Sequence, residues 1–120
     1  MPPSRPVVAF AWLALALLPP CAAAAGPADH IRRGRDLLAQ YQCGACHAIP
    51  GVPGSRGEVA QPLTAWGKRS YIAGRLVNRP DLLVQWIVAP QAMVPGTTMP
   101  SMGVSREDAQ AMAAYLFSLD

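Results

Sequence analysis

Apolar residues recur at helical spacing in three segments of the chain. In the first segment, residues 29–42, Asp29 is suited to cap a helix, and the apolar side chains fall on one face: Ile31, Leu37, Leu38 and Tyr41. Gly34 lies inside this segment, where glycine costs about 1 kcal/mol relative to alanine, so we expect a second helix to approach closely there. The pattern predicts an amphipathic helix that leads directly to Cys43.

The second helix is predicted between two prolines. Pro80 and Asp81 suit the first turn of a helix that begins after Asn78. The helix is expected to end at Ala89, because Pro90 disfavours helical backbone in the residue before it.

The last helix has the most complete start signal. Ser105 is expected to cap it, and Asp108, three residues later, completes a capping box. Its apolar residues recur at helical spacing: Ala109, Met112, Ala113, Leu116 and Leu119.

Glycine and proline interrupt the chain between these helices. Residues 48–64 and 91–103 are rich in both and are predicted as loops, while residues 66–77 are predicted as a short helix interrupted near Gly74. No segment shows the alternation of apolar and polar residues that indicates a half-buried strand. The chain is therefore predicted to be all-α, with three main helices and a short one.

Residues 1–25 have the pattern of a cleavable secretory signal. Arg5 supplies a positive start, and residues 7–18 form an apolar core that small residues follow. This apolar run of about 12 residues is too short to span a bilayer, which takes roughly 20. Cys21 follows the run as a lipidated cysteine would, but Pro20 does not suit such a signal. We expect export to a periplasm, with no lipid anchor and no transmembrane segment after cleavage.

Removal of the signal leaves residues 26–120, a length that suits one domain with one core. Without Arg5, the ten Lys and Arg residues become nine, against seven Asp and Glu. This small excess does not indicate nucleic-acid binding, which needs a clustered basic stripe. Positive charge is concentrated only in residues 32–35 and in the trio Lys68, Arg69 and Arg75. The first run is expected to be a solvated helix face, with docking to an acidic partner as the alternative.

The strongest chemical signal directly follows the first helix. The segment Cys43-Gly44-Ala45-Cys46-His47 is C-x-x-C-H, the signature of covalent c-type haem attachment. Two thiols at this spacing can each add to one vinyl group of a porphyrin, and the adjacent imidazole can hold the iron. We expect one haem c, attached through Cys43 and Cys46, with His47 as an axial ligand.

A cysteine pair at this spacing also has two other uses. A thiol–disulfide pair would be expected within a βαβ unit, which this chain lacks. A zinc site would need two more ligands at the spacing of a zinc finger. The only other Cys and His residues are Cys21 and His30. The haem interpretation therefore fits the chain best.

A haem held by His47 has a second axial position. His30 lies on the helix that leads to the attachment site, so a methionine is the better candidate. Met112 is on the core face of a helix, where methionine usually fills space, whereas Met99 lies in a loop flanked by proline and glycine. We predict Met99 as the second ligand, with Met102 and an apolar role for the Met99 side chain as alternatives.

With these features together, the chain resembles the class I cytochrome c family over essentially all of residues 26–120. The resemblance rests on an ordered set of positions: Gly34, the motif at 43–47, Pro62-Leu63, residues 95–100 with Met99, and Tyr115. Residues 63–99 look most like the cytochrome c domain fused to subunit II of some haem-copper oxidases. The resemblance implies a small helical fold packed around haem, with Gly34 and Tyr115 at the crossing of the first and last helices.

The resemblance also implies roles for three further residues. The Pro62 carbonyl would accept a hydrogen bond from His47 and so fix the imidazole. Arg69 would approach a haem propionate, and Trp86 would lie against the porphyrin. The related domains carry Gly-Pro-Asp-Leu where residues 60–63 of this chain read Ala-Gln-Pro-Leu.

These features predict an exported one-electron carrier in a respiratory or periplasmic redox chain, and not an enzyme. The iron would cycle between Fe(III) and Fe(II) with His47 and Met99 as axial ligands. The expected partners are a redox donor and a redox acceptor, with a terminal oxidase or a dehydrogenase as candidates. Two alternatives stay open: a haem-based sensor or ligand-binding protein with a labile sixth site, and a haem subunit of a larger complex.

Overall fold

The computed structural model of the protein describes residues 1–4 and 23–120. Most of the predicted signal segment, including Cys21, lies outside the described residues. Within them, no helix combines the length and the apolar character needed to cross a membrane.

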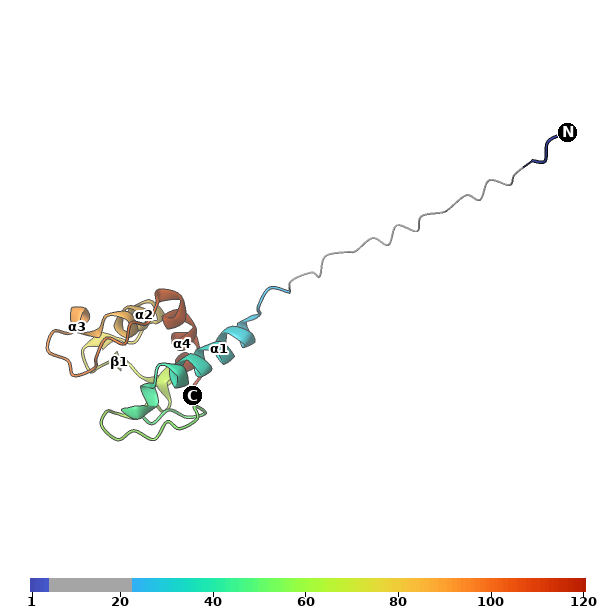
Figure 1. Ribbon diagram of the computed structural model, residues 1–120. Helices are drawn as coiled ribbons and strands as arrows, with labels where there is room; N and C mark the ends of the chain where they lie inside the picture. Colours follow the sequence, from blue (N-terminus) through green and yellow to red (C-terminus); the bar gives the residue numbers. More distant parts are fainter. Residues whose placement is uncertain (5–22) are drawn as a thin grey trace.

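Three main helices frame the domain (Figure 1). α1 spans Pro27–Gln40, α2 spans Pro80–Val88 and α4 spans Arg106–Phe117, while the one-turn α3, Pro90–Met93, directly follows α2. Single 3-10 turns occur at Cys43–Ala45 (η1) and Trp66–Lys68 (η2). The three main helices lie where the pattern predicted them, but the short fourth helix lies in a segment predicted as a loop.

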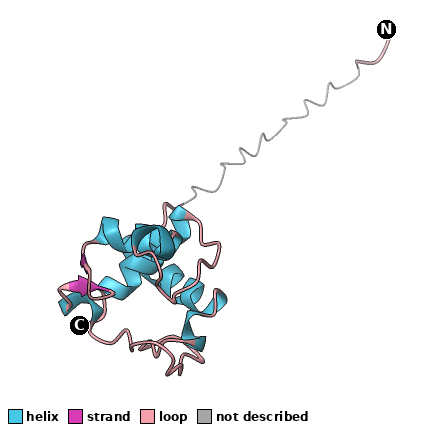
Figure 2. Cartoon of the chain, turned by 90° about the vertical axis from the view of Figure 1, so that its left-hand side faces the viewer, coloured by secondary structure: helices cyan, strands magenta, loops and turns pink. Residues whose placement is uncertain are grey.

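Residues 66–77 do not form the predicted interrupted helix. After η2 they form a small antiparallel hairpin, with β1 at Tyr71–Ile72 and β2 at Leu76–Val77 (Figure 2). Ala73 and Gly74 lie in its three-residue loop, with φ angles of 50° and 68° in the left-handed region. Gly74 is therefore a turn residue, and strands of two residues each are too short to give a period-two signal.

The predicted helix starts are right for α4 and wrong for α1. Ser105 accepts a hydrogen bond from the backbone N–H of Asp108 at 3.1 Å, as expected of an N-cap. At α1 the N-cap is Gly26, and Asp29 lies inside the first turn, where its carboxylate accepts from the Gly26 N–H at 3.2 Å. Pro27 sets this start, because its missing N–H has no partner to lose in the first turn.

Helices α1 and α4 cross at Gly34. A Cβ at this position would overlap the backbone carbonyl of Ala111, so glycine allows the two backbones to meet. Tyr115, also predicted at the crossing, is a buried residue of α4 one turn after Ala111, and its hydroxyl donates to the Pro50 carbonyl of the long loop at 2.6 Å. One apolar core forms around these contacts, and Met112 is fully buried in it, as predicted.

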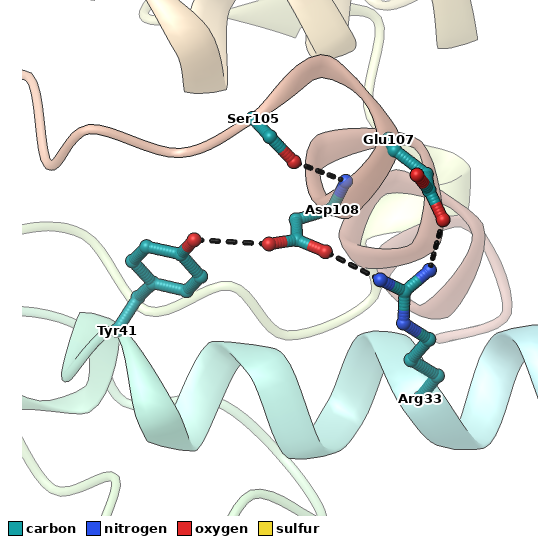
Figure 3. Close-up of polar contacts among 5 residues, drawn as sticks. All are labelled: Arg33, Tyr41, Ser105, Glu107 and Asp108. Carbon is teal, nitrogen blue, oxygen red and sulfur yellow. Dashed lines mark hydrogen bonds and ion pairs between the residues drawn. The ribbon is translucent and has the colours of Figure 1, made fainter.

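A polar cluster fastens the start of α4 to α1 (Figure 3). Arg33 donates to Glu107 at 3.0 Å and to Asp108 at 2.6 Å. The Tyr41 hydroxyl donates to the other oxygen of Asp108 at 2.9 Å. The Asp108 carboxylate therefore joins the two helices and does not return to the Ser105 backbone as a full capping box would. Arg33, expected on a solvated face, is an interhelical contact.

Replacement of Gly34 tests how closely the backbones of α1 and α4 approach each other. Gly34→Ala should lower the free energy of unfolding by roughly 1–3 kcal/mol, the usual cost of overpacking, because the new Cβ overlaps the Ala111 carbonyl. Gly26→Ser is the control, since a Cβ at Gly26 meets nothing within 4 Å and serine is a good N-cap. Urea unfolding followed by circular dichroism measures both. Equal stability of the two variants would contradict the close approach.

The bond between Tyr41 and Asp108 should make stability depend on alkaline pH. Hydrogen bonding to Asp108 raises the pKa of Tyr41, and the negative charge of that carboxylate acts in the same direction. The folded protein thus holds the phenolic proton more tightly than the unfolded chain. This contribution to stability is complete below the unfolded pKa of about 10 and is lost as pH rises through the higher folded pKa.

Tyr41→Phe should therefore be less stable than the unchanged protein near neutral pH, and the difference between the two should shrink above about pH 10. Urea titrations at several pH values measure this difference. Because Tyr115 is present in both proteins, its own titration cancels. A difference that does not change with pH would show that the phenolic proton is not involved.

Candidate functional site

The C-x-x-C-H motif lies in a tight turn immediately after α1. Gln42, with a φ angle of 56°, turns the chain out of the helix, and η1 begins at Cys43. Cys43 and Cys46 are free thiols with partly buried side chains. Burial raises the pKa of the Cys43 thiol.

Glycines allow the loop of residues 48–64 to lie directly on the motif. A Cβ on Gly44 would overlap Ser55, and one on Gly57 would overlap the backbone around Cys46. The Gly57 N–H also donates to the Gly44 carbonyl at 2.9 Å. The loop predicted from its glycines and prolines therefore forms a close cover over the motif.

The backbone of the same loop orients His47. Its Nδ1 lies 2.7 Å from the carbonyl oxygen of Gln61. A proton on Nδ1 would be donated to this oxygen, and Nε2 would then keep its lone pair for a metal ion. The imidazole of His47, the residue after Cys46, is thus held in a fixed orientation.

The predicted partner of this imidazole, the Pro62 carbonyl, is wrong by one residue. Backbone hydrogen bonds of 2.9 and 2.8 Å tie residues 60–63 to residues 46–48, and this pairing sets the Gln61 carbonyl against the ring. The Pro62 carbonyl accepts from Arg69 instead. The register between residues 60–63 and residues 46–48 decides which carbonyl orients the His47 ring. The sequence does not reveal this register.

Arg69 lies against backbone carbonyls and an aromatic ring. Its guanidinium donates to the carbonyls of Pro62 and Thr64, the second at 2.9 Å, and lies 5.3 Å from the centre of the Trp66 ring. None of the ion pairs in the described part of the chain includes Arg69. Its contact with a propionate stays a prediction.

Trp66 carries a buried N–H group without a partner. The side chain is 5% exposed, and within residues 23–120 its Nε1 has no hydrogen-bond acceptor. Leaving such a donor unsatisfied costs about 1–3 kcal/mol. Sequence reasoning missed Trp66, because a lone tryptophan after a loop is indistinguishable from an ordinary core residue.

Asn78 supports the same region. Its Nδ2 donates to the carbonyls of Trp66 and Arg69, both at 3.0 Å, while its buried Oδ1 has no partner among the described residues. Asn78 therefore fixes the backbone at Trp66 and at Arg69. An asparagine between a hairpin and a helix gives no sequence signal of such a bridge.

The remaining predicted site residues belong to the apolar interior. Trp86 is 7% exposed and lies in the core. Met99 is partly buried and packs against that core, whereas Met102 is 46% exposed. Of the two candidate sulfur ligands, Met99 is the one that contacts the interior.

Comparison with known proteins shows that the chain belongs to the cytochrome c family. The model of that family, cytochrome c, matches residues 31–120. The chain is also similar to cytochrome c oxidase subunit 2 of Alkalihalophilus pseudofirmus, with 39% identity over 89 residues. This match covers 72% of the present chain and 25% of the relative, so the chain spans about a quarter of that protein's length. Membership of the family supports a haem-dependent electron carrier.

Proposed function

We propose that this protein is an exported one-electron carrier with a single haem c. The haem would be attached through Cys43 and Cys46, with His47 and Met99 as axial ligands. The observation that carries this proposal is the fixed imidazole: Nδ1 of His47 lies 2.7 Å from the Gln61 carbonyl, and His47 directly follows Cys46 in the C-x-x-C-H motif. Bound haem supplies the Fe(III)/Fe(II) couple.

The residues of the chain fit such a group. Two free thiols follow α1 at the attachment spacing, and Met99 contacts the interior. The buried Nε1 of Trp66 has no acceptor among the described residues, and the Arg69 cation lies over the same ring. A haem brings two carboxylate side chains, and a carboxylate is the strong acceptor that such an N–H and a guanidinium would bind. We therefore add Trp66 to Arg69 as a propionate-binding residue.

The chain's own groups would tune the electron affinity of the site. The Gln61 carbonyl, as acceptor from Nδ1, makes the His47 ring a more basic ligand and fixes its orientation. A methionine sulfur in the sixth position raises the potential. No part of this chemistry makes or breaks a bond in a substrate, so we propose a carrier rather than an enzyme.

The contrast between the two candidate methionines favours a closed sixth position over a sensor or ligand-binding protein. Met99 packs against the core and Met102 is largely exposed. The similarity to an oxidase subunit favours a terminal oxidase as the electron acceptor. Export to a periplasm rests on the signal-like pattern of residues 1–25.

Replacement of Met99 tests the ligand assignment. Met99→Ala should abolish the weak red-edge absorption band of sulfur-ligated ferric haem, permit carbon monoxide binding and lower the potential. Met102→Ala, at the exposed position, is the matched control and should change none of these. A redox titration with simultaneous optical spectra on the exported holoprotein measures them. If Met102→Ala alters spectrum and potential while Met99→Ala does not, Met102 is the ligand.

Replacement of Trp66 tests its proposed bond to a propionate. Trp66→Phe should lower the potential, because a carboxylate that has lost its donor places more negative charge near the iron and favours Fe(III). Ser118→Ala is the control, since it also loses a partly buried hydrogen bond, but one to the Tyr115 carbonyl at the end of α4. That control should lose stability and keep its potential. An unchanged potential in Trp66→Phe would assign the orphaned N–H to water instead.

A further inference from the structure

The first part of the long loop consists of two consecutive turns of the same kind. Residues 49–55 read Ile-Pro-Gly-Val-Pro-Gly-Ser, so the pair Pro-Gly occurs twice at an interval of three residues. Each turn is closed by the backbone N–H of its fourth residue, Val52 or Ser55, which donates to the carbonyl of the first residue at 3.3 Å. The glycines, Gly51 and Gly54, have φ angles of 75° and 69°. Proline in the second position and a glycine with positive φ in the third are typical of a type II turn.

The two turns bring the side chain of Ser55 back to the backbone that follows the attachment motif. Its hydroxyl donates to the His47 carbonyl at 2.9 Å and accepts from the Ile49 N–H at 2.8 Å. Ala48, between these two residues, pairs with Arg56 in an antiparallel bridge. The donor and one acceptor position of the hydroxyl are thus both used. One side chain therefore fixes the backbone on both sides of Ala48.

Ser55 is held in place by contact with the motif itself. A Cβ on Gly44 would lie 2.6 Å from the Ser55 Cα and 2.8 Å from both its Cβ and its Oγ, so the backbones of the two residues touch. Two residues after Ser55, the Gly57 N–H donates to the Gly44 carbonyl at 2.9 Å. These contacts keep the serine at a fixed distance from the turn that carries the two cysteines.

The ring and the backbone of His47 are held by different groups. The ring contacts the Gln61 carbonyl through Nδ1, at 2.7 Å. The backbone N–H of His47 donates to the Cys43 carbonyl at 3.0 Å, and its carbonyl accepts from Ser55. Only two side-chain torsions separate the imidazole from this backbone, so the bond between Nδ1 and Gln61 keeps its geometry only while the backbone stays in place. Contacts behind a metal ligand orient it in this way.

We propose that Ser55 is a positioning residue for the His47 imidazole, and that it acts through the backbone on the bond between Nδ1 and the Gln61 carbonyl. This inference rests on the proposed function, because the imidazole is an axial ligand only if haem is attached at the motif. A firm bond at Nδ1 makes the imidazole a more basic ligand, which favours Fe(III) and lowers the potential. The Ser55 hydroxyl would therefore help to set the potential through the protein backbone.

Removal of the Ser55 hydroxyl from the holoprotein tests the proposal. Ser55→Ala should raise the potential and change the proton NMR shifts of the haem methyl groups in the ferric protein, which depend on the orientation of the axial imidazole plane. Ser105→Ala is the matched control, because it loses the same atom and a bond to a backbone N–H, but at the start of α4. It should lower the stability and leave the potential and the methyl shifts unchanged. Redox titration, NMR and urea unfolding of the three proteins measure these effects.

A second pair of variants changes the turn and keeps the hydroxyl. A Cβ on Gly54 meets nothing within 4 Å, so only its φ angle of 69° opposes a side chain there. Gly54→Val should displace Ser55 and shift the potential in the same direction as Ser55→Ala, because a β-branched residue is strongly disfavoured at positive φ. Gly54→Asn is the control and should keep the potential of the unchanged protein, because asparagine tolerates this conformation.

Two results would overturn the positioning role and leave the carrier intact. The first is an Ser55→Ala protein with the potential and methyl shifts of the unchanged protein. The second is an equal change in Ser105→Ala, which would assign the effect to lost stability. Failure of the proposed function is distinct from both: an unchanged protein without a reversible haem couple would refute the carrier, and the role of Ser55 with it.

Discussion

The structure depends on the close contact between α1 and α4 at Gly34. Because the two backbones touch there, α4 fixes the position of α1, and α1 ends just before the attachment motif. The cluster around Asp108 adds a second contact between the same helices, and its Tyr41 is two residues before Cys43. The thiols and the imidazole thus start from a helix that cannot shift without breaking its contacts with the last helix of the chain.

The long loop completes the site through backbone groups. Residues 60–63 pair with residues 46–48, and this pairing supplies the carbonyl that orients His47. Tyr115 anchors the beginning of the same loop to α4 through the Pro50 carbonyl. The loop therefore owes its shape to contacts at both of its ends and to glycines that let it lie on the motif. A regular helix or strand could not follow the motif so closely, because its own hydrogen bonds would occupy the carbonyls that the site uses.

Charge is distributed differently in two regions of the chain. The arginines of α1 form local or interhelical ion pairs and so contribute to holding the fold. The cations of residues 66–79 are mostly without carboxylate partners in the described chain and flank exposed apolar side chains. The nearly neutral net charge after the signal concealed this separation, because composition averages over both regions.

The sequence by itself determined the three main helices, the attachment motif, the close approach at Gly34 and the core position of Met112. Each of these features leaves a signal in a short stretch of sequence, so periodicity, capping residues and spacing reveal them. Tertiary structure decided that Gln61 rather than Pro62 contacts His47, that residues 71–77 form a hairpin, and that the Trp66 N–H has no partner within residues 23–120. The hairpin is local, but its two-residue strands are too short to give a sequence signal. The contact between Gln61 and His47 depends on how two segments of the chain align, and a one-residue change of register exchanges one carbonyl for the next. Local pattern carries no information about that alignment, and only the packed chain supplies it.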